Sequence, residues 1–179
     1  MESIDYIHQH PELNEVILSG GDPLMAKDDA ISWFVSQLEL IPNIRRLRIH
    51  TRLPVVIPSR ITQALCDILK NSRLKTIMVL HINHENEISP ELASGLLKLK
   101  QANCTLLNQA VLLKNINDNV ATQVNLSERL FEVGILPYYL HLFDKVDGAS
   151  HFNIDEADAK RVYGQMLVEL PGFLMPKLV

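Results

Sequence analysis

The chain has 179 residues, and its 17 lysine and arginine residues against 21 aspartate and glutamate residues give a formal net charge of −4 with histidine neutral. This charge argues against a general nucleic-acid-binding surface. Hydrophobic residues make up 47% of the chain and charged residues 21%, a composition that disfavours a disordered or fibrous protein. We therefore expect one globular domain, or part of a larger one.

The sequence also bears on the cell compartment and on metal content. No apolar run approaches the roughly 20 residues that cross a bilayer, and the segment Met1 to Asp5 lacks the basic and then apolar layout of a secretory signal. We expect a cytoplasmic protein without a membrane partner. Cys66 and Cys104 show no C-x-x-C spacing, so they are predicted to be buried thiols rather than ligands of zinc or of an iron–sulfur cluster.

Short β-rich runs alternate with longer amphipathic stretches, which is the pattern of a parallel sheet covered by helices. In chain order, the predicted elements are the end of a helix at Ile4 to His8, a strand at Glu15 to Ser19, a helix at Asp28 to Leu40, a strand at Leu47 to His50, a helix at Ser59 to Leu69, a strand at Thr76 to His81, a helix at Pro90 to Gln101, a strand at Thr105 to Ala110, a helix at Ser127 to Val133, a strand at Ile135 to Leu140, a helix at Asp155 to Leu170 and a strand at Pro171 to Val179. A closed eight-unit barrel needs about 250 residues, so these roughly five to six βα units form either an open sheet or an incomplete barrel. We favour an α/β fold of the second kind, an incomplete (β/α) barrel.

Polar residues follow the predicted strands at the points where the strands end. These segments are Ser19 to Asp22, His50 to Arg52, His81 to His84, Asn108 to Gln109 and His141 to Asp144. Ligands of parallel α/β folds bind at the carboxyl ends of the strands, because the adjustable loops converge there. The coincidence predicts one common ligand site at this edge of the sheet.

The first loop and the second strand supply the first candidates for this site. Gly20–Gly21 would let the backbone approach a ligand closely, and Asp22 could bind an ammonium group. A tight strand-to-helix turn explains the same residues equally well. Arg52 lies at the end of its strand and is a candidate for contact with an anion. Arg45 and Arg46 are predicted to be solvated charges at the edge of the sheet.

The later loops supply two histidines and a carboxylate. His81 and His84 could ligate a metal, but no third ligand stands at a recognisable spacing, so we expect His81 to act as a hydrogen-bonding group. The alternative for Asn83 and His84 is a role in loop structure. Asp144 could bind a cationic substrate or cap the next turn.

The segment Leu18 to Leu24, with the sequence LSGGDPL, resembles a signature of the lysine 2,3-aminomutase family of radical S-adenosylmethionine (SAM) enzymes. Further matches in the same order are Arg48 to Thr62, His81 to Ile88, Asn108 to Asp118 and Pro137 to Phe152. The resemblance is strongest to the bacterial branch that acts in β-lysylation of elongation factor P, whose proteins carry a similar HLFDKVDGA-type segment.

The resemblance implies a cofactor set and a site. In such enzymes a [4Fe-4S] cluster cleaves SAM, the resulting radical takes a hydrogen from lysine, and pyridoxal phosphate carries the amino group from C2 to C3. The positions implied to bind the cofactors are Ser19, Gly20, Gly21, Asp22, Arg52, His81 and Gln109. By the same resemblance, Asp144 holds the remote ammonium of lysine.

The resemblance also implies two departures from the family. The family's cluster cysteines, spaced C-x-x-x-C-x-x-C, lie upstream of the Gly-Gly-Asp block, and no cysteine stands in Met1 to Leu18. The family's cofactor lysine lies beyond the segment that matches Pro171 to Val179, and Lys177 is not assigned to that role. We therefore expect residues 1–179 to form a partial radical SAM barrel domain, inactive alone, with no catalytic or metal-binding residue of its own.

These observations give three hypotheses for the function. The first is a fragment of a lysine 2,3-aminomutase-like isomerase, whose exposed sheet edges would favour a homo-oligomer or complementary fragments. The second is a degenerate module that binds SAM or an amino acid without catalysis. The third is a metal-dependent barrel hydrolase that uses His81 and His84, and it ranks last because its ligand set is incomplete.

Overall fold

The computed structural model describes residues 2–144 and 148–179 and contains one sheet of six parallel strands in chain order. The strands are β1 (Glu15–Leu18), β2 (Arg46–Thr51), β3 (Lys75–His81), β4 (Thr105–Val111), β5 (Leu136–His141) and β6 (Lys177–Leu178). Doubly wound sheets reverse their strand order at a switch point, whereas barrels keep the sequential order seen here. Because β1 and β6 are the two end strands, the sheet is open, and the predicted incomplete barrel is confirmed.

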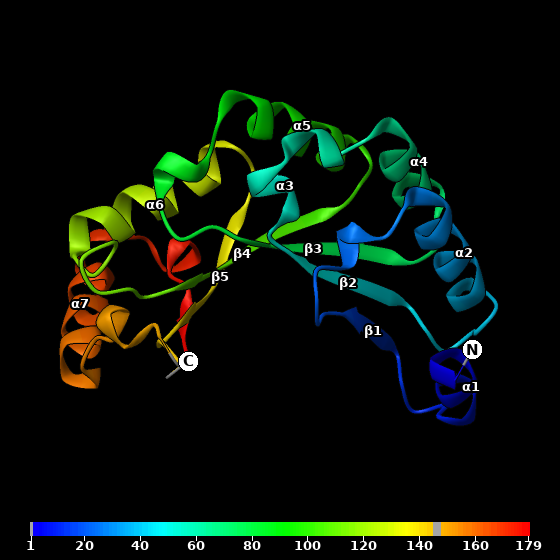
Figure 1. Cartoon of the computed structure of the whole chain (residues 1–179), viewed down its shortest axis with the longest axis horizontal. Coiled ribbons are helices and arrows are strands. Elements are labelled where there is room, and N and C mark those ends of the chain that lie inside the picture. Colours follow the sequence, from blue (N-terminus) through cyan, green and yellow to red (C-terminus); the bar gives the residue numbers. More distant parts are fainter. Residues whose placement is uncertain (1, 145–147) are drawn as a thin grey trace.

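Helices follow the strands and lie mainly on the convex side of the curved sheet (Figure 1). They are α1 (Glu2–Gln9), α2 (Asp28–Glu39), α3 (Leu53–Val56), α4 (Gln63–Asn71), α5 (Pro90–Gln101), α6 (Val120–Glu132) and α7 (Glu156–Glu169). Side chains cap the helices where the sequence offers a hydroxyl: Thr62 accepts from the amide of Leu65, and Ser89 from that of Leu92. Over the described residues, no helix is both long and apolar enough to span a membrane.

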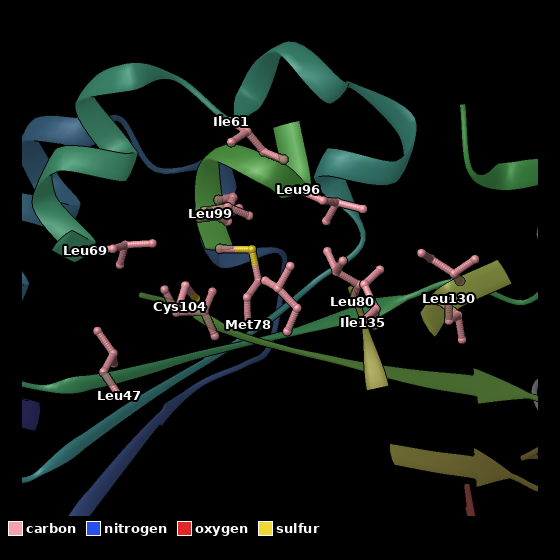
Figure 2. Close-up of a cluster of buried hydrophobic side chains, with 14 of the residues drawn as sticks. Leu47, Ile61, Leu69, Met78, Leu80, Leu96, Leu99, Cys104, Leu130 and Ile135 are labelled. Atoms are coloured by element: carbon pink, nitrogen blue, oxygen red, sulfur yellow. The ribbon is translucent and has the colours of Figure 1, made fainter. Parts of the chain in front are cut away.

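The core lies between the sheet and the helices that cover it. Along β2, Leu47, Ile49 and Thr51 are buried, while the alternating Arg48 and His50 are only partly buried. Figure 2 shows the same layer, in which Leu47, Met78 and Leu80 of the sheet lie beneath Leu96 and Leu99 of α5. Since successive side chains of a strand point to opposite faces, every second residue is left on the concave face.

Three predicted elements differ from the structure by more than two residues at a boundary. The helix expected at Ser127 begins at Val120, because Asn119 caps it by accepting from the amide of Thr122 at 2.9 Å. The strand expected over Pro171 to Val179 is confined to Lys177–Leu178, because residues 172–174 form a 3-10 turn. The helix expected at Ser59 begins at Gln63, and the short α3 was not predicted.

The sheet is curved strongly enough for side chains of β2 and β5 to meet across its concave face. Arg48 of β2 pairs with Glu15 at 2.9 Å and donates to the hydroxyl of Tyr138 at 3.2 Å, although β3 and β4 lie between the two strands. A register irregularity between Asn108 and Gln109 places Tyr138 beside Tyr139, with ring centroids 3.9 Å apart. The barrel-like curvature is therefore fixed by a polar network as well as by the strands.

We expect Arg48→Met to lower the free energy of unfolding by about 1–3 kcal/mol, because the half-buried Glu15 carboxylate and the Tyr138 hydroxyl lose their partner. Urea unfolding followed by circular dichroism measures this difference. Arg45→Met is the matched control, since Arg45 is exposed and directly precedes the same strand. Equal stabilities of the two variants would contradict a structural role for the network.

Candidate functional site

The loop after β1 contains two glycines whose backbone lies in the left-handed region. Gly20 has φ +83° and Gly21 has φ +54°, and a Cβ added at either would meet no atom within 4 Å. Ser19, Gly20 and Gly21 are all exposed. Such a conformation is strained for other residues but open to glycine, so the loop leaves free space directly beside its backbone.

The carboxylate of Asp22 closes this loop onto the end of β2. One oxygen accepts from the amide of Leu24 at 3.0 Å and from the hydroxyl of Thr51 at 2.6 Å. The other oxygen accepts from the amides of Arg52 at 2.8 Å and Leu53 at 2.9 Å. A carboxylate offers about four acceptor sites, so these hydrogen bonds occupy all the acceptor sites of Asp22. Asp22 positions the loops here, and its contact with a ligand ammonium group stays a prediction.

The same hydrogen bonds keep Asp22 ionised. Burial alone would raise the pKa of the Asp22 carboxyl, but the Thr51 hydroxyl and the three backbone amides together lower this pKa below its ordinary value. The site therefore carries a fixed negative charge at the end of β1.

Arg52 joins the ends of β2 and β3. Its guanidinium donates to the carbonyl of His81 at 3.0 Å and to the carboxylate of Glu87 at 2.7 Å. The other oxygen of Glu87 accepts from the amides of Asn83 at 2.7 Å and His84 at 3.0 Å. Arg52 was predicted to contact an anion, and the anion that it contacts in this structure is the side chain of Glu87.

His84 uses one ring nitrogen to hold the loop after β3. Its Nδ1 accepts from the amide of Asn86 at 3.2 Å and caps the short turn Glu85–Glu87. Over residues 2–144 and 148–179, no group of three or more histidine, cysteine, aspartate or glutamate side chains could hold a metal ion. The geometry gives His84 the loop-structuring role.

A row of side chains crosses the concave face at one register position. The register pairs His81 with Gln109, Gln109 with Tyr139, and Tyr139 with Lys177. His81 alternates with the core residue Leu80, so the row lies on the face opposite the helices. The structure thus brings His81 and Gln109 side by side, as the predicted site requires.

Histidines add to this row from neighbouring strands. His50 of β2 lies edge-on to His81, with ring centroids 6.1 Å apart and an interplanar angle of 74°. The Nε2 atoms of His50, His81 and His141 are buried and lack a hydrogen-bond partner within the described chain. Burial first, and then the Arg48 guanidinium, lower the pKa of His50, while burial and then His50 lower the pKa of His81. Both imidazoles are therefore neutral at pH 7.

The predicted site residues fall into two groups. Asp22, Arg52, His81 and Gln109 are linked through the contacts described above, whereas Asp144 is exposed beyond the end of β5 and borders residues 145–147, outside the described chain. Glu87 and Tyr139 also belong to the site and were not predicted there, whereas His50 and Thr51 were predicted only as part of the strand-end segment His50 to Arg52. Alternation along β2 is the signal that could have placed His50 on the same face as Arg48.

Cys66 and Cys104 do not fit an iron–sulfur cluster. Both are buried free thiols, as predicted. Burial raises the pKa of Cys66, and it raises the pKa of Cys104 to about 11. A cysteine that binds an iron–sulfur cluster must be a thiolate. The thiols of Cys66 and Cys104 instead pack in the hydrophobic core.

Comparisons with known proteins agree with the motifs. No protein-family model matches the chain. The chain is 55% identical to an L-lysine 2,3-aminomutase of Haemophilus influenzae and 50% identical to one of Escherichia coli, in each case over 98% of this chain and 52% of the relative. A glutamate 2,3-aminomutase of Clostridioides difficile is 36% identical over 99% of this chain and 42% of that protein. The predicted resemblance to lysine 2,3-aminomutases is confirmed, and the chain spans about half the length of the curated relatives it matches.

A solved structure supports the fold. A radical SAM methyltransferase from Sphaerobacter thermophilus superposes with a TM-score of 0.68 at 16% sequence identity, over 93% of this chain and 51% of that chain. At this identity the likeness concerns the fold alone. The open parallel sheet therefore shares the fold of about half of that enzyme.

Proposed function

We propose that this chain is the SAM-binding part of a radical SAM lysine 2,3-aminomutase, which converts L-lysine to β-lysine for the modification of elongation factor P. The observation that carries the proposal is an identity of 50–55% to proteins named L-lysine 2,3-aminomutase along 98% of the chain. The lower identity of 36% to a glutamate 2,3-aminomutase favours lysine as the substrate. The exposed Asp144 is the proposed contact for the remote ammonium of that substrate.

The residues present fit SAM. The open space beside Gly20 and Gly21 admits a ligand against the backbone, and the unpartnered Nε2 of His81 offers it a hydrogen bond beside Gln109. Asp22 holds this loop in place through the backbone of Arg52. When bound, SAM supplies the radical chemistry of the family.

We further propose that residues 1–179 form a partial barrel domain that is inactive alone. The two thiols of the chain are buried in the core and do not fit the [4Fe-4S] cluster. Lys177 shares the concave row with His81 and is not proposed as the anchor of pyridoxal phosphate. For activity, the domain would depend on groups that bind the cluster and pyridoxal phosphate and that lie outside the row of His81, Gln109, Tyr139 and Lys177.

Isothermal titration calorimetry of the chain with SAM tests the proposal. We expect saturable binding, and we expect Gly20→Val to weaken it about tenfold, or about 1.4 kcal/mol, because the new side chain fills the open space beside the loop. Gly164→Ala is the control, since a Cβ there also meets no atom within 4 Å but lies on α7. A folded chain that binds no SAM would refute the proposal.

A further inference from the structure

The turn that follows the two glycines of the first loop is held together by its own hydrogen bonds. It contains the 3-10 helix η1 (Pro23–Met25), in which the amide of Ala26 donates to the carbonyl of Pro23 at 3.2 Å. The amide of Leu24 donates to the carboxylate of Asp22 at 3.0 Å. Residues 22–26 therefore form one unit, and the orientation of this unit sets the position of the glycine backbone that precedes it.

Asp22 attaches only one end of this unit to the rest of the chain. Its carboxylate accepts from the amides of Arg52 and Leu53, directly after β2. A unit that is held at one point can still turn about that point. Gly20 and Gly21 oppose such a rotation little, because glycine adopts φ of either sign readily. Fixing the orientation of residues 22–26 therefore requires a second point of attachment.

Arg60 supplies the second attachment. Its Nε donates to the carbonyl of Leu24 at 2.6 Å, and its Nη2 donates to the carbonyl of Ala26 at 2.9 Å. Its Nη1 pairs at 2.7 Å with the carboxylate of Asp28, which also accepts from the hydroxyl of Thr62 at 2.6 Å. The Arg60 side chain is only 14% exposed, so water competes little for these contacts. The planar fork of a guanidinium is the side-chain group that serves all three acceptors at once.

Arg60 is itself held in a short turn. It ends the 3-10 helix η2 (Pro58–Arg60), in which its amide donates to the carbonyl of Ile57 at 2.9 Å. Both attachments of residues 22–26 therefore come from one segment, the connection between β2 and α4. This connection braces the loop after β1 at two points.

We infer that Arg60 is a positioning residue for SAM, which acts by holding the loop Ser19 to Asp22 in its binding conformation and not by contact with SAM. The inference rests on the proposed function, since it takes this loop as the one that binds SAM. A loop that is ordered before binding loses less conformational freedom when the ligand binds. Loss of the Arg60 guanidinium should therefore weaken SAM binding although no group that contacts SAM is removed.

Isothermal titration calorimetry of the 179-residue chain with SAM tests the inference. We expect Arg60→Gln to weaken SAM binding about three- to tenfold, because the loop must then be ordered on binding. Arg60→Lys keeps the positive charge beside Asp28 but lacks the fork of donors, so its affinity should lie between those of Arg60→Gln and the unmodified chain. Equal SAM affinities of Arg60→Gln and the unmodified chain would overturn the inference.

Arg73→Gln is the matched control for a loss of stability alone. The Arg73 guanidinium also donates to backbone carbonyls, those of Ile41 and Ile44 at 2.8 Å each, but these lie before the start of β2. Circular dichroism and urea unfolding should show that both glutamine variants are folded and less stable, whereas only Arg60→Gln should lose SAM affinity. An equal loss of SAM affinity in Arg73→Gln would leave Arg60 with a structural role only and would overturn the inference.

Nuclear magnetic resonance of the backbone amides separates this inference from the proposed function. Without SAM, Arg60→Gln should shift or broaden the amide signals of Gly20 and Gly21 and leave that of Gly164 on α7 unchanged. If the unmodified chain binds no SAM, the proposed function fails, and the two glycine signals decide the role of Arg60: a change supports it, and unchanged signals overturn it. If the unmodified chain and Arg60→Gln bind SAM alike, the proposed function stands and the inference is wrong.

Discussion

Replacing Asp22 by asparagine should lower the free energy of unfolding by about 2–4 kcal/mol, because hydrogen bonds to a charged group contribute more than neutral ones. The carboxylate accepts from one hydroxyl and three backbone amides, and an asparagine amide would turn a donor toward two of these donors. Urea unfolding monitored by circular dichroism measures the loss. Asp29→Asn, at an exposed position in the first turn of α2, should change stability by less than about 0.5 kcal/mol.

The same substitution should show a defined pH dependence. The pKa of Asp22 is lower in the folded chain than in the unfolded chain, so the unfolded chain binds more protons as the pH falls. The stability that Asp22 contributes is therefore fully present above the ordinary aspartate pKa of about 3.9 and is lost as the pH falls through the folded pKa. The difference between the unmodified chain and Asp22→Asn should shrink below about pH 4. A difference that is constant across the acid range would show that the carboxylate charge is irrelevant.

The sheet could be predicted because its signals are local. Each main strand is a short apolar run followed by polar residues, and α5 begins and ends as predicted because Ser89 and Pro90 mark its start. The start of α6 was missed because Val120 and Thr122 are β-branched and weigh against a helix. The cap at Asn119 and the packing of the helix against the sheet outweigh that preference.

The roles of the site residues could be predicted only in part. The strand-end positions of Asp22, His81 and Gln109 follow from the motif order, and the structure places them at one edge. The partners of these residues do not follow from sequence, since Arg52 reaches Glu87 across 35 positions. No local pattern encodes such contacts, because they depend on the curvature that brings successive loops together.

The buried side chain of Asn117 gives a second prediction of large effect. Its oxygen accepts from the amide of Leu113 at 2.7 Å, and its nitrogen donates to the carbonyls of Asn83 at 2.8 Å and Val111 at 2.9 Å. Asn117→Ala leaves all three backbone groups unsatisfied around a fully buried position, so we expect a loss of about 3–5 kcal/mol in the free energy of unfolding. Urea unfolding again provides the measurement.

Loss of the Asn117 side chain should also change the position of His81, because Asn117 holds Asn83, which is two residues after His81. The side chain of Asn83 in turn accepts from the amide of Val111 at 2.9 Å. Asn119→Ala removes the exposed cap of α6 and should cost only about 1 kcal/mol. Its imidazole signals should match those of the unmodified chain, whereas Asn117→Ala should shift the signal of His81. If the two variants lose equal stability, the buried amide does not hold the loop after β3, and the position of His81 must be set by the contact of Arg52 with its carbonyl.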